Sequence, residues 1–204
     1  MTYRDQYTGY HQQLPQDVSR LEASGKRIIL GYTSDLDVVL EWNDEVFSEI
    51  LTAFLREEPA LRPGDVIDSM ESFARVVSHY IIRGLGGEID ITNIEVCEQL
   101  EKRFHTGYAL GGTCAQGAAA LNAVGFPVIA HITDRSREVC RLMSGAGLDT
   151  VTREGVAPMM QSATSELPVR HMILQYPKGT TITYNGKSWQ APVSNRLIMD
   201  FDTI

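Results

Sequence analysis

The sequence predicts an α/β protein, and three observations carry that prediction. Short apolar runs at residues 28–32 and 127–133 are typical of buried strands. A stretch at 44–56 repeats apolar side chains at helical spacing, and Asn43 is placed to cap it. The small residues of 111–125 suit a helix that begins close to neighbouring backbone. Strand and helix therefore alternate, which favours a mostly parallel sheet.

The other elements follow from local signals. We expect a break at 59–64, a helix over about 65–83 that ends at a glycine-rich segment, and a helix from Asn93 to about 104. Residues 88–91 alternate like a strand edge, and another helix covers about 136–143. Segments 172–176 and 180–184 flank a turn, and Asn185-Gly186 forms a second one, so we expect antiparallel hairpins that form a lid. Residues 195–200 return toward the core.

Composition narrows the function classes. The 204 residues are 43% hydrophobic and carry a net charge of -8, as expected for a folded chain without a basic cluster for nucleic acid. No apolar run approaches the length of a membrane span, and residues 1–17 lack the pattern of a secretion signal. We therefore expect a cytoplasmic protein with no nucleic-acid or membrane partner. Three scattered cysteines indicate buried thiols, and the isolated histidines indicate no metal site.

A few polar and glycine positions suit a ligand site. Gly111 and Gly112 precede a helix, where backbone N–H groups meet a ligand or where the chain simply packs tightly. Asp37 follows a buried strand, at the edge where α/β proteins bind ligands; it is either a sugar-hydroxyl acceptor or a solvated turn acid. Asp35 and Glu88 carry the same two readings. Arg196 fits a phosphate or a structural ion pair.

Four segments together resemble a known family. Gly31-Tyr-Thr-Ser-Asp-Leu-Asp-Val-Val, Leu85-Gly-Gly-Glu, Leu110-Gly-Gly-Thr-Cys-Ala-Gln-Gly and Ser194-Asn-Arg-Leu-Ile follow the family order from about residue 25 onward. They are similar to the ADP-dependent glucokinases and phosphofructokinases, which are ribokinase-like sugar kinases. The resemblance implies a partial, Rossmann-like parallel sheet with helices on both faces and a small β lid.

The resemblance also implies roles for individual residues. Asp37 matches a sugar-hydroxyl aspartate, Asp35 stands where the family has asparagine, and Glu88 matches an acid of the lid. Gly111 and Gly112, with Thr113 beside them, match sugar contacts. Asn195 and Arg196 match a pair expected at the nucleotide phosphates. Gln175 replaces an expected glutamate.

The expected division of the chain follows the same resemblance. The incomplete α/β core comprises residues 1–30, 45–83, 93–168 and 194–204. The sugar-binding lid comprises residues 31–44, 84–92 and 169–193.

The family's transfer segment, a Gly-x-Gly-Asp with its catalytic aspartate, is not found in these residues, and family members are much longer. We therefore expect the sugar-binding N-terminal portion of an ADP-dependent sugar kinase, inactive alone and with no catalytic residue. The complete enzyme uses ADP and Mg²⁺; this chain is expected to bind a sugar or sugar phosphate, with a C-terminal half or a second copy covering its exposed core. The alternative is a non-catalytic sugar-binding or assembly protein with a kinase-like pocket.

Overall fold

The computed structural model describes residues 2–56 and 66–202, and the chain forms two compact units. Unit 1 comprises Met1–Asp35 and Leu110–Pro168; unit 2 comprises Leu36–Ala109 and Val169–Ile204. The break expected at 59–64 lies outside the described residues. Within the described ranges, no helix combines the length and apolarity needed to cross a membrane.

Unit 1 is built on a four-stranded sheet in the order β1-β5-β6-β7. Strands β1, β5 and β6 run parallel, and β7 closes the sheet antiparallel to β6. The two apolar runs predicted as strands are confirmed as β1 and β5. The strands are β1 (Ile28–Tyr32), β5 (Val128–Ile132), β6 (Asp149–Thr152) and β7 (Gly155–Pro158).

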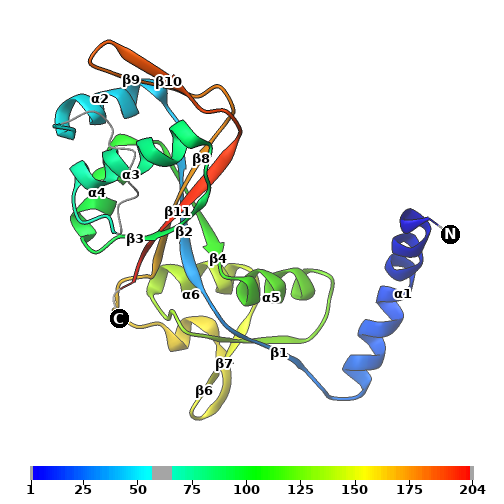
Figure 1. Ribbon diagram of the computed structural model, residues 1–204. Helices are drawn as coiled ribbons and strands as arrows, with labels where there is room; N and C mark the ends of the chain where they lie inside the picture. The colour runs from blue at the N-terminus through cyan, green and yellow to red at the C-terminus, as the bar shows by residue number, and fades with distance from the viewer. Residues whose placement is uncertain (1, 57–65, 203–204) are drawn as a thin grey trace. The chain divides into compact units, whose positions relative to one another are not determined.

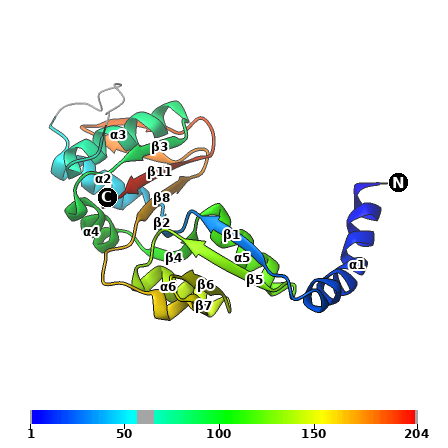
Figure 2. The same ribbon diagram turned by 90° about the horizontal axis from the view of Figure 1, so that it is seen from below.

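The predicted helices of unit 1 are present. Helix α5 (Thr113–Ala123) packs against β1 and β5, which lie side by side in Figure 2. Its small side chains Ala115 and Ala118 are fully buried, so the helix lies close to the sheet. Helix α6 (Arg137–Gly145) begins at Ser136, whose hydroxyl accepts from the Val139 N–H, and packs on the 3-10 turn η1 (Met159–Ser162).

Helix α1 (Tyr3–Ala23) was not predicted from the sequence. A capping box between Thr2 and Asp5 starts it, but none of its residues is buried. The segment has Pro15 inside it and a polar, tyrosine-rich composition without a broad apolar face. Its helical periodicity was therefore too weak to distinguish it from a loop.

Unit 2 carries a mixed five-stranded sheet in the order β3-β11-β8-β2-β4. Strand β8 runs parallel to β2 and antiparallel to β11, and β11 runs parallel to β3. The strands are β2 (Asp35–Glu41), β3 (Gly87–Asp90), β4 (Thr106–Gly111), β8 (Arg170–Tyr176) and β11 (Asn195–Phe201).

Three helices of unit 2 gather on one side of this sheet (Figure 1). They are α2 (Asp44–Phe54), α3 (Met70–Arg83) and α4 (Ile94–Arg103). Asn43 and Asn93 cap α2 and α4 as predicted. Helix α3 begins at Met70 rather than at residue 65, because the Ser69 hydroxyl caps it through the Ser72 N–H.

One of the two predicted hairpins is wrong. Strand β9 (Thr181–Tyr184) pairs with β10 (Lys187–Gln190) through the turn at Asn185 and Gly186, both with positive φ, as predicted. The expected pairing of 172–176 with 180–184 does not occur, since β8 instead pairs with β2 and β11. Local turn signals did not reveal these longer-range partners.

The expected α/β class is confirmed, and the core and lid assignment stays a prediction. Within unit 2, the helices of 44–83 belong to the same compact unit as most residues expected in the lid.

Candidate functional site

The five-stranded sheet of unit 2 has two chemically different faces. Alternate residues of β2, β8 and β11 are apolar and buried, including Val38, Met172 and Met199. On this helix-covered face Arg170 pairs with Glu101 of α4 at 3.1 Å. The residues that alternate with these buried ones along β2, β8 and β11 form the other face of the sheet, together with two residues of β3. This face is called here the polar face. Its members are Asp37, Val39, Glu41, Glu88, Asp90, His171, Ile173, Gln175, Arg196, Ile198 and Asp200.

His171 lies between two carboxylates on the polar face. Strand register places it opposite Asp37 of β2 and Asp200 of β11. Its Nδ1 is 3.8 Å from an Asp37 oxygen, and its Nε2 is 3.6 Å from an Asp200 oxygen. The Asp37 side chain is 17% exposed and the Asp200 side chain 27% exposed, so both carboxylates are partly withdrawn from water. A ligand with several hydroxyl groups fits such acceptors.

Negative charge accumulates along this row. Burial raises the pKa of Asp200, the His171 imidazole lowers it, and the carboxylates of Glu88 and Asp90 raise it. Glu88 is exposed and lies opposite Ile198, one strand away from Asp200. The polar face therefore favours hydroxyl donors near Asp200 and Glu88 and disfavours an anion there.

The raised pKa of Asp200 predicts a pH-dependent stability difference. The folded chain keeps this proton to a higher pH than the unfolded chain, so ionisation costs folding free energy as pH rises above 3.8, the ordinary Asp value. We expect Asp200→Asn to gain stability relative to the native chain between pH 3.8 and neutrality, measured as the midpoint of urea unfolding. Asp149→Asn controls for the loss of one negative charge, because Asp149 is an exposed partner of Arg27 in unit 1. A constant difference at all pH values would contradict this expectation.

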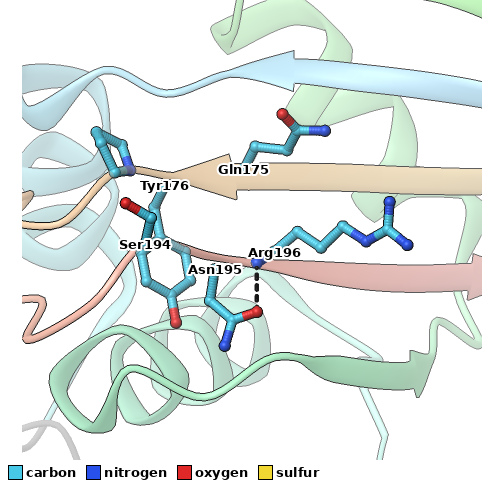
Figure 3. Close-up of a pocket in the computed structure, with 6 residues that line it drawn as sticks. Gln175, Tyr176, Ser194, Asn195 and Arg196 are labelled. Atoms are coloured by element: carbon cyan, nitrogen blue, oxygen red, sulfur yellow. Dashed lines mark hydrogen bonds between the residues drawn. The ribbon is translucent and has the colours of Figure 1, made fainter. Parts of the chain in front are cut away.

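Arg196 lies at the other end of the polar face. It lines a shallow pocket of about 650 Å³ together with Gln175, Tyr176, Pro177, Ser194 and Asn195. The residues of this pocket are drawn in Figure 3. Asp200 lies four positions further along β11, roughly 13 Å away at the usual rise per residue. Its exposed guanidinium fits a phosphate at a distance from the carboxylates.

Asn195 is directed differently from Arg196. Figure 3 shows its side chain on the side of α3, away from Gln175. Its Nδ2 donates to the Gly84 carbonyl at 3.0 Å, and its Oδ1 accepts from the Arg196 N–H at 3.0 Å. With these bonds the Asn195 side chain has a structural role, because it joins the backbone of residues 84 and 196. Its expected role at nucleotide phosphates stays a prediction.

The Gly111-Gly112 segment belongs to unit 1, where it meets the loop after β1. Gly112 has a φ of +88°, and a Cβ there would overlap the Thr33 carbonyl oxygen and lie 2.9 Å from Ser34 Cα. Cys114 donates from Sγ to the same carbonyl at 2.9 Å. Tight packing therefore accounts for Gly112, whereas a ligand contact by Gly111, Gly112 or Thr113 stays a prediction.

The loop at Thr33 is also fixed from its other side. The Ser34 hydroxyl accepts from the Asp134 N–H at 3.1 Å, and Asp134 in turn accepts from the Ser136 N–H at 2.7 Å. Asp35 is buried, 5% exposed, at the start of β2. Asp35 and Asp37 follow strand β1, as expected, but they belong to the next strand, β2, and not to a turn.

The three cysteines are free and buried, as predicted. Burial raises the pKa of each thiol, for Cys97 to about 11. The start of α5 therefore does not yield a reactive thiolate at Cys114.

The conserved region of the ADP-specific phosphofructokinase/glucokinase family matches residues 26–204. The chain belongs to this family. A comparison with curated proteins finds no match. The match begins after α1, so both units but not this helix carry the family pattern.

Solved structures show that this family member has the fold of ADP-dependent kinases. A last common ancestor of ADP-dependent phosphofructokinases from Methanosarcinales is 20% identical, with a TM-score of 0.71 over 98% of this chain and 43% of its own. A hypothetical ADP-dependent phosphofructokinase from Pyrococcus horikoshii is 20% identical, with a TM-score of 0.67 over 87% of this chain and 42% of its own. An ADP-dependent kinase in complex with fructose-6-phosphate and ADPβS is 18% identical, with a TM-score of 0.62 over 94% of this chain and 39% of its own. The chain thus spans less than half the length of these structures.

The sequence of this family member did not reveal three residues of the polar face. His171, Asp200 and Asp90 join the row that contains Asp37 only through pairing of β2, β8, β11 and β3. The sequence did contain one signal for this face: polar and apolar residues alternate along Arg170–Tyr176 and Asn195–Phe201. It identifies a face but not the partners across it.

Proposed function

We propose that the polar face of unit 2 binds the sugar of an ADP-dependent sugar kinase. The observation that carries this proposal is the row Asp37, His171 and Asp200, with Glu88 beside it, on one face of a sheet from this family. Partly buried carboxylates accept strong hydrogen bonds from hydroxyl groups. A hexose or hexose phosphate offers several such groups on one small molecule.

The charge distribution indicates how such a ligand is oriented. Its hydroxyls face the carboxylates, and a phosphate group is directed toward Arg196, roughly 13 Å along β11 from Asp200. That phosphate belongs either to the sugar or to a nucleotide. The bound fructose-6-phosphate and ADPβS of the similar kinase structure supply both precedents.

In a complete enzyme the reaction transfers a phosphoryl group from ADP to a sugar hydroxyl. Arg196 is the residue here that fits a nucleotide phosphate; Mg²⁺, when bound, offsets phosphate charge. We propose that the groups that transfer the phosphoryl lie outside these 204 residues, which contain no Gly-x-Gly-Asp segment. A C-terminal half or a second chain would bring them, and we also propose a cytoplasmic location.

The same absence of a transfer segment favours one alternative, a non-catalytic sugar-binding protein. It keeps the carboxylate row and binds a sugar without turning it over. The kinase portion and the non-catalytic protein both bind sugar, and they differ in whether the sugar is phosphorylated once the phosphoryl-transfer groups are supplied.

Calorimetric titration of the 204-residue chain tests the proposal. We expect glucose or fructose 6-phosphate to bind, because either presents hydroxyls to the carboxylate row, and we expect no sugar phosphorylation when ADP and Mg²⁺ are added. A folded sample that binds neither sugar would contradict the site. Rapid phosphorylation would show that the transfer groups are present after all, and tight ADP binding without sugar binding would favour a nucleotide-binding domain.

A further inference from the structure

Strand β3 holds Glu88 on the polar face and is short. It has four residues, Gly87–Asp90, and follows Gly84 and Gly86. Only Ile89 of its four residues is buried, and a strand with so few buried side chains specifies its pairing register weakly. Glu88 lies opposite Ile198, and Ile89, 8% exposed, lies opposite Met199. A slip of one residue would exchange the two faces, turning Glu88 toward the helices and Ile89 toward the polar face.

The two ends of β3 are held by different groups. After Glu88, the Asp90 carbonyl accepts from the Ile67 N–H at 2.8 Å, and the Ile91 N–H donates to the Asp200 carbonyl at 2.7 Å. Before Glu88, the Gly84 N–H donates to the Ile81 carbonyl and the Leu85 N–H donates to the Tyr80 carbonyl, and two side chains add further contacts. Asn195 Nδ2 donates to the Gly84 carbonyl at 3.0 Å, and the Tyr176 hydroxyl donates to the Leu85 carbonyl at 2.5 Å.

Gly86 permits the close contact with Asn195. A Cβ at residue 86 would overlap Asn195 Oδ1 and lie 2.8 Å from the Arg196 carbonyl oxygen. The Asn195 side chain is also fixed at its own position, because Oδ1 accepts from the Arg196 N–H. The segments Leu85-Gly-Gly-Glu and Ser194-Asn-Arg therefore form one junction, at the point where β3 and β11 begin to pair.

We infer that Asn195 is a positioning residue that fixes the register of β3 on β11 and so keeps Glu88 on the polar face. The hydrogen bond to Gly84 sets the start of the strand, and the bond to the Arg196 N–H sets the amide against β11. The effect on sugar binding rests on the proposed function; the effect on register does not.

Hydrogen exchange on the ligand-free chain tests how firmly Asn195 holds the start of β3 on β11. In Asn195→Ala and Asn195→Asp, which both lose the donor to Gly84, we expect amide exchange at residues 84–89 to rise about tenfold, the typical effect of one lost hydrogen bond. Asn122→Ala is the matched control, since Asn122 Nδ2 donates to the Ala146 carbonyl at 2.8 Å in unit 1. Gly86→Ala disturbs the same contact from the segment that precedes β3 and should raise exchange at the same residues. Unchanged exchange in Asn195→Ala, or native protection in Asn195→Asp, would overturn the inference.

A double-mutant cycle tests the consequence for Glu88. We expect Asn195→Ala to weaken sugar binding about tenfold in the native background but not in the Glu88→Gln background, because its effect passes through Glu88. Equal loss in both backgrounds would overturn the positioning role. If Glu88→Gln leaves sugar binding unchanged, the proposed sugar role of Glu88 fails, and the exchange experiment still decides the role of Asn195.

Discussion

Asp37→Asn should weaken sugar binding about 10- to 100-fold, the typical effect of losing a hydrogen bond to a charged acceptor. The Asp37 side chain is 17% exposed and its carboxylate lies 3.8 Å from His171. Because so little of this side chain contacts water, a sugar hydroxyl that binds the carboxylate displaces little water. Asparagine keeps the shape of the side chain but replaces one acceptor oxygen with a donor. Calorimetric titration with fructose 6-phosphate and glucose measures the loss.

Asp149→Asn is the matched control for this substitution. Asp149 also lies near a basic group, 3.9 Å from Arg27, but it belongs to unit 1 and is half exposed. Its replacement should leave sugar affinity unchanged. Equal affinity of Asp37→Asn and the native chain would remove Asp37 from the site.

Gly112→Ala should destabilise the chain by about 3 kcal/mol, combining a positive φ with overpacking against backbone. The added Cβ would overlap the Thr33 carbonyl oxygen and lie 2.7 Å from its carbon. Neither atom belongs to a flexible side chain, so the loop after β1 must move. By the usual scaling the melting temperature falls by on the order of 10 °C, which thermal unfolding followed by circular dichroism measures.

Gly145→Ala serves as the control in the same unit. Gly145 ends α6, and a Cβ there meets nothing within 4 Å. Alanine should be neutral or slightly stabilising at this helical position. If Gly112→Ala melts at the same temperature as Gly145→Ala, the close contact with Thr33 is wrong.

The local elements were predictable where a single segment contains its own signal. Strand β1 is an apolar run, and α2 combines an Asn43 cap with apolar residues at helical spacing. The hairpin of β9 and β10 contains an Asn-Gly turn that imposes positive φ. Each of these signals lies within a few residues of the element that it specifies.

The elements that the sequence did not predict correctly depend on distant strand partners or lack a pattern of apolar residues. Strand β8 precedes a turn signal but pairs with β2 and β11, and its alternating apolar residues are buried. Strand β4 contains Gly107 and exposed residues, so neither alternation nor an apolar run marks it. Helix α1 buries no side chain.

The candidate site shows the same division. Asp37 was predicted because it lies in a recognisable acidic segment of the family pattern. His171 and Asp200 were not, since their proximity to Asp37 arises from strand register across three strands. The expected ligand role of Asn195 rests on the match of Asn195 and Arg196 to a pair in the family and stays a prediction; alternation along β11 turns the Asn195 side chain to the face opposite Arg196.

The most direct measurement is the set of backbone amide chemical-shift changes that fructose 6-phosphate and glucose cause in the 204-residue chain. If the polar face binds the sugar, the largest changes fall on Asp37, His171, Asp200 and Glu88, and they disappear in Asp37→Asn. Saturable binding whose changes fall elsewhere, or no binding by the folded chain, would contradict the assignment of this face as the sugar site.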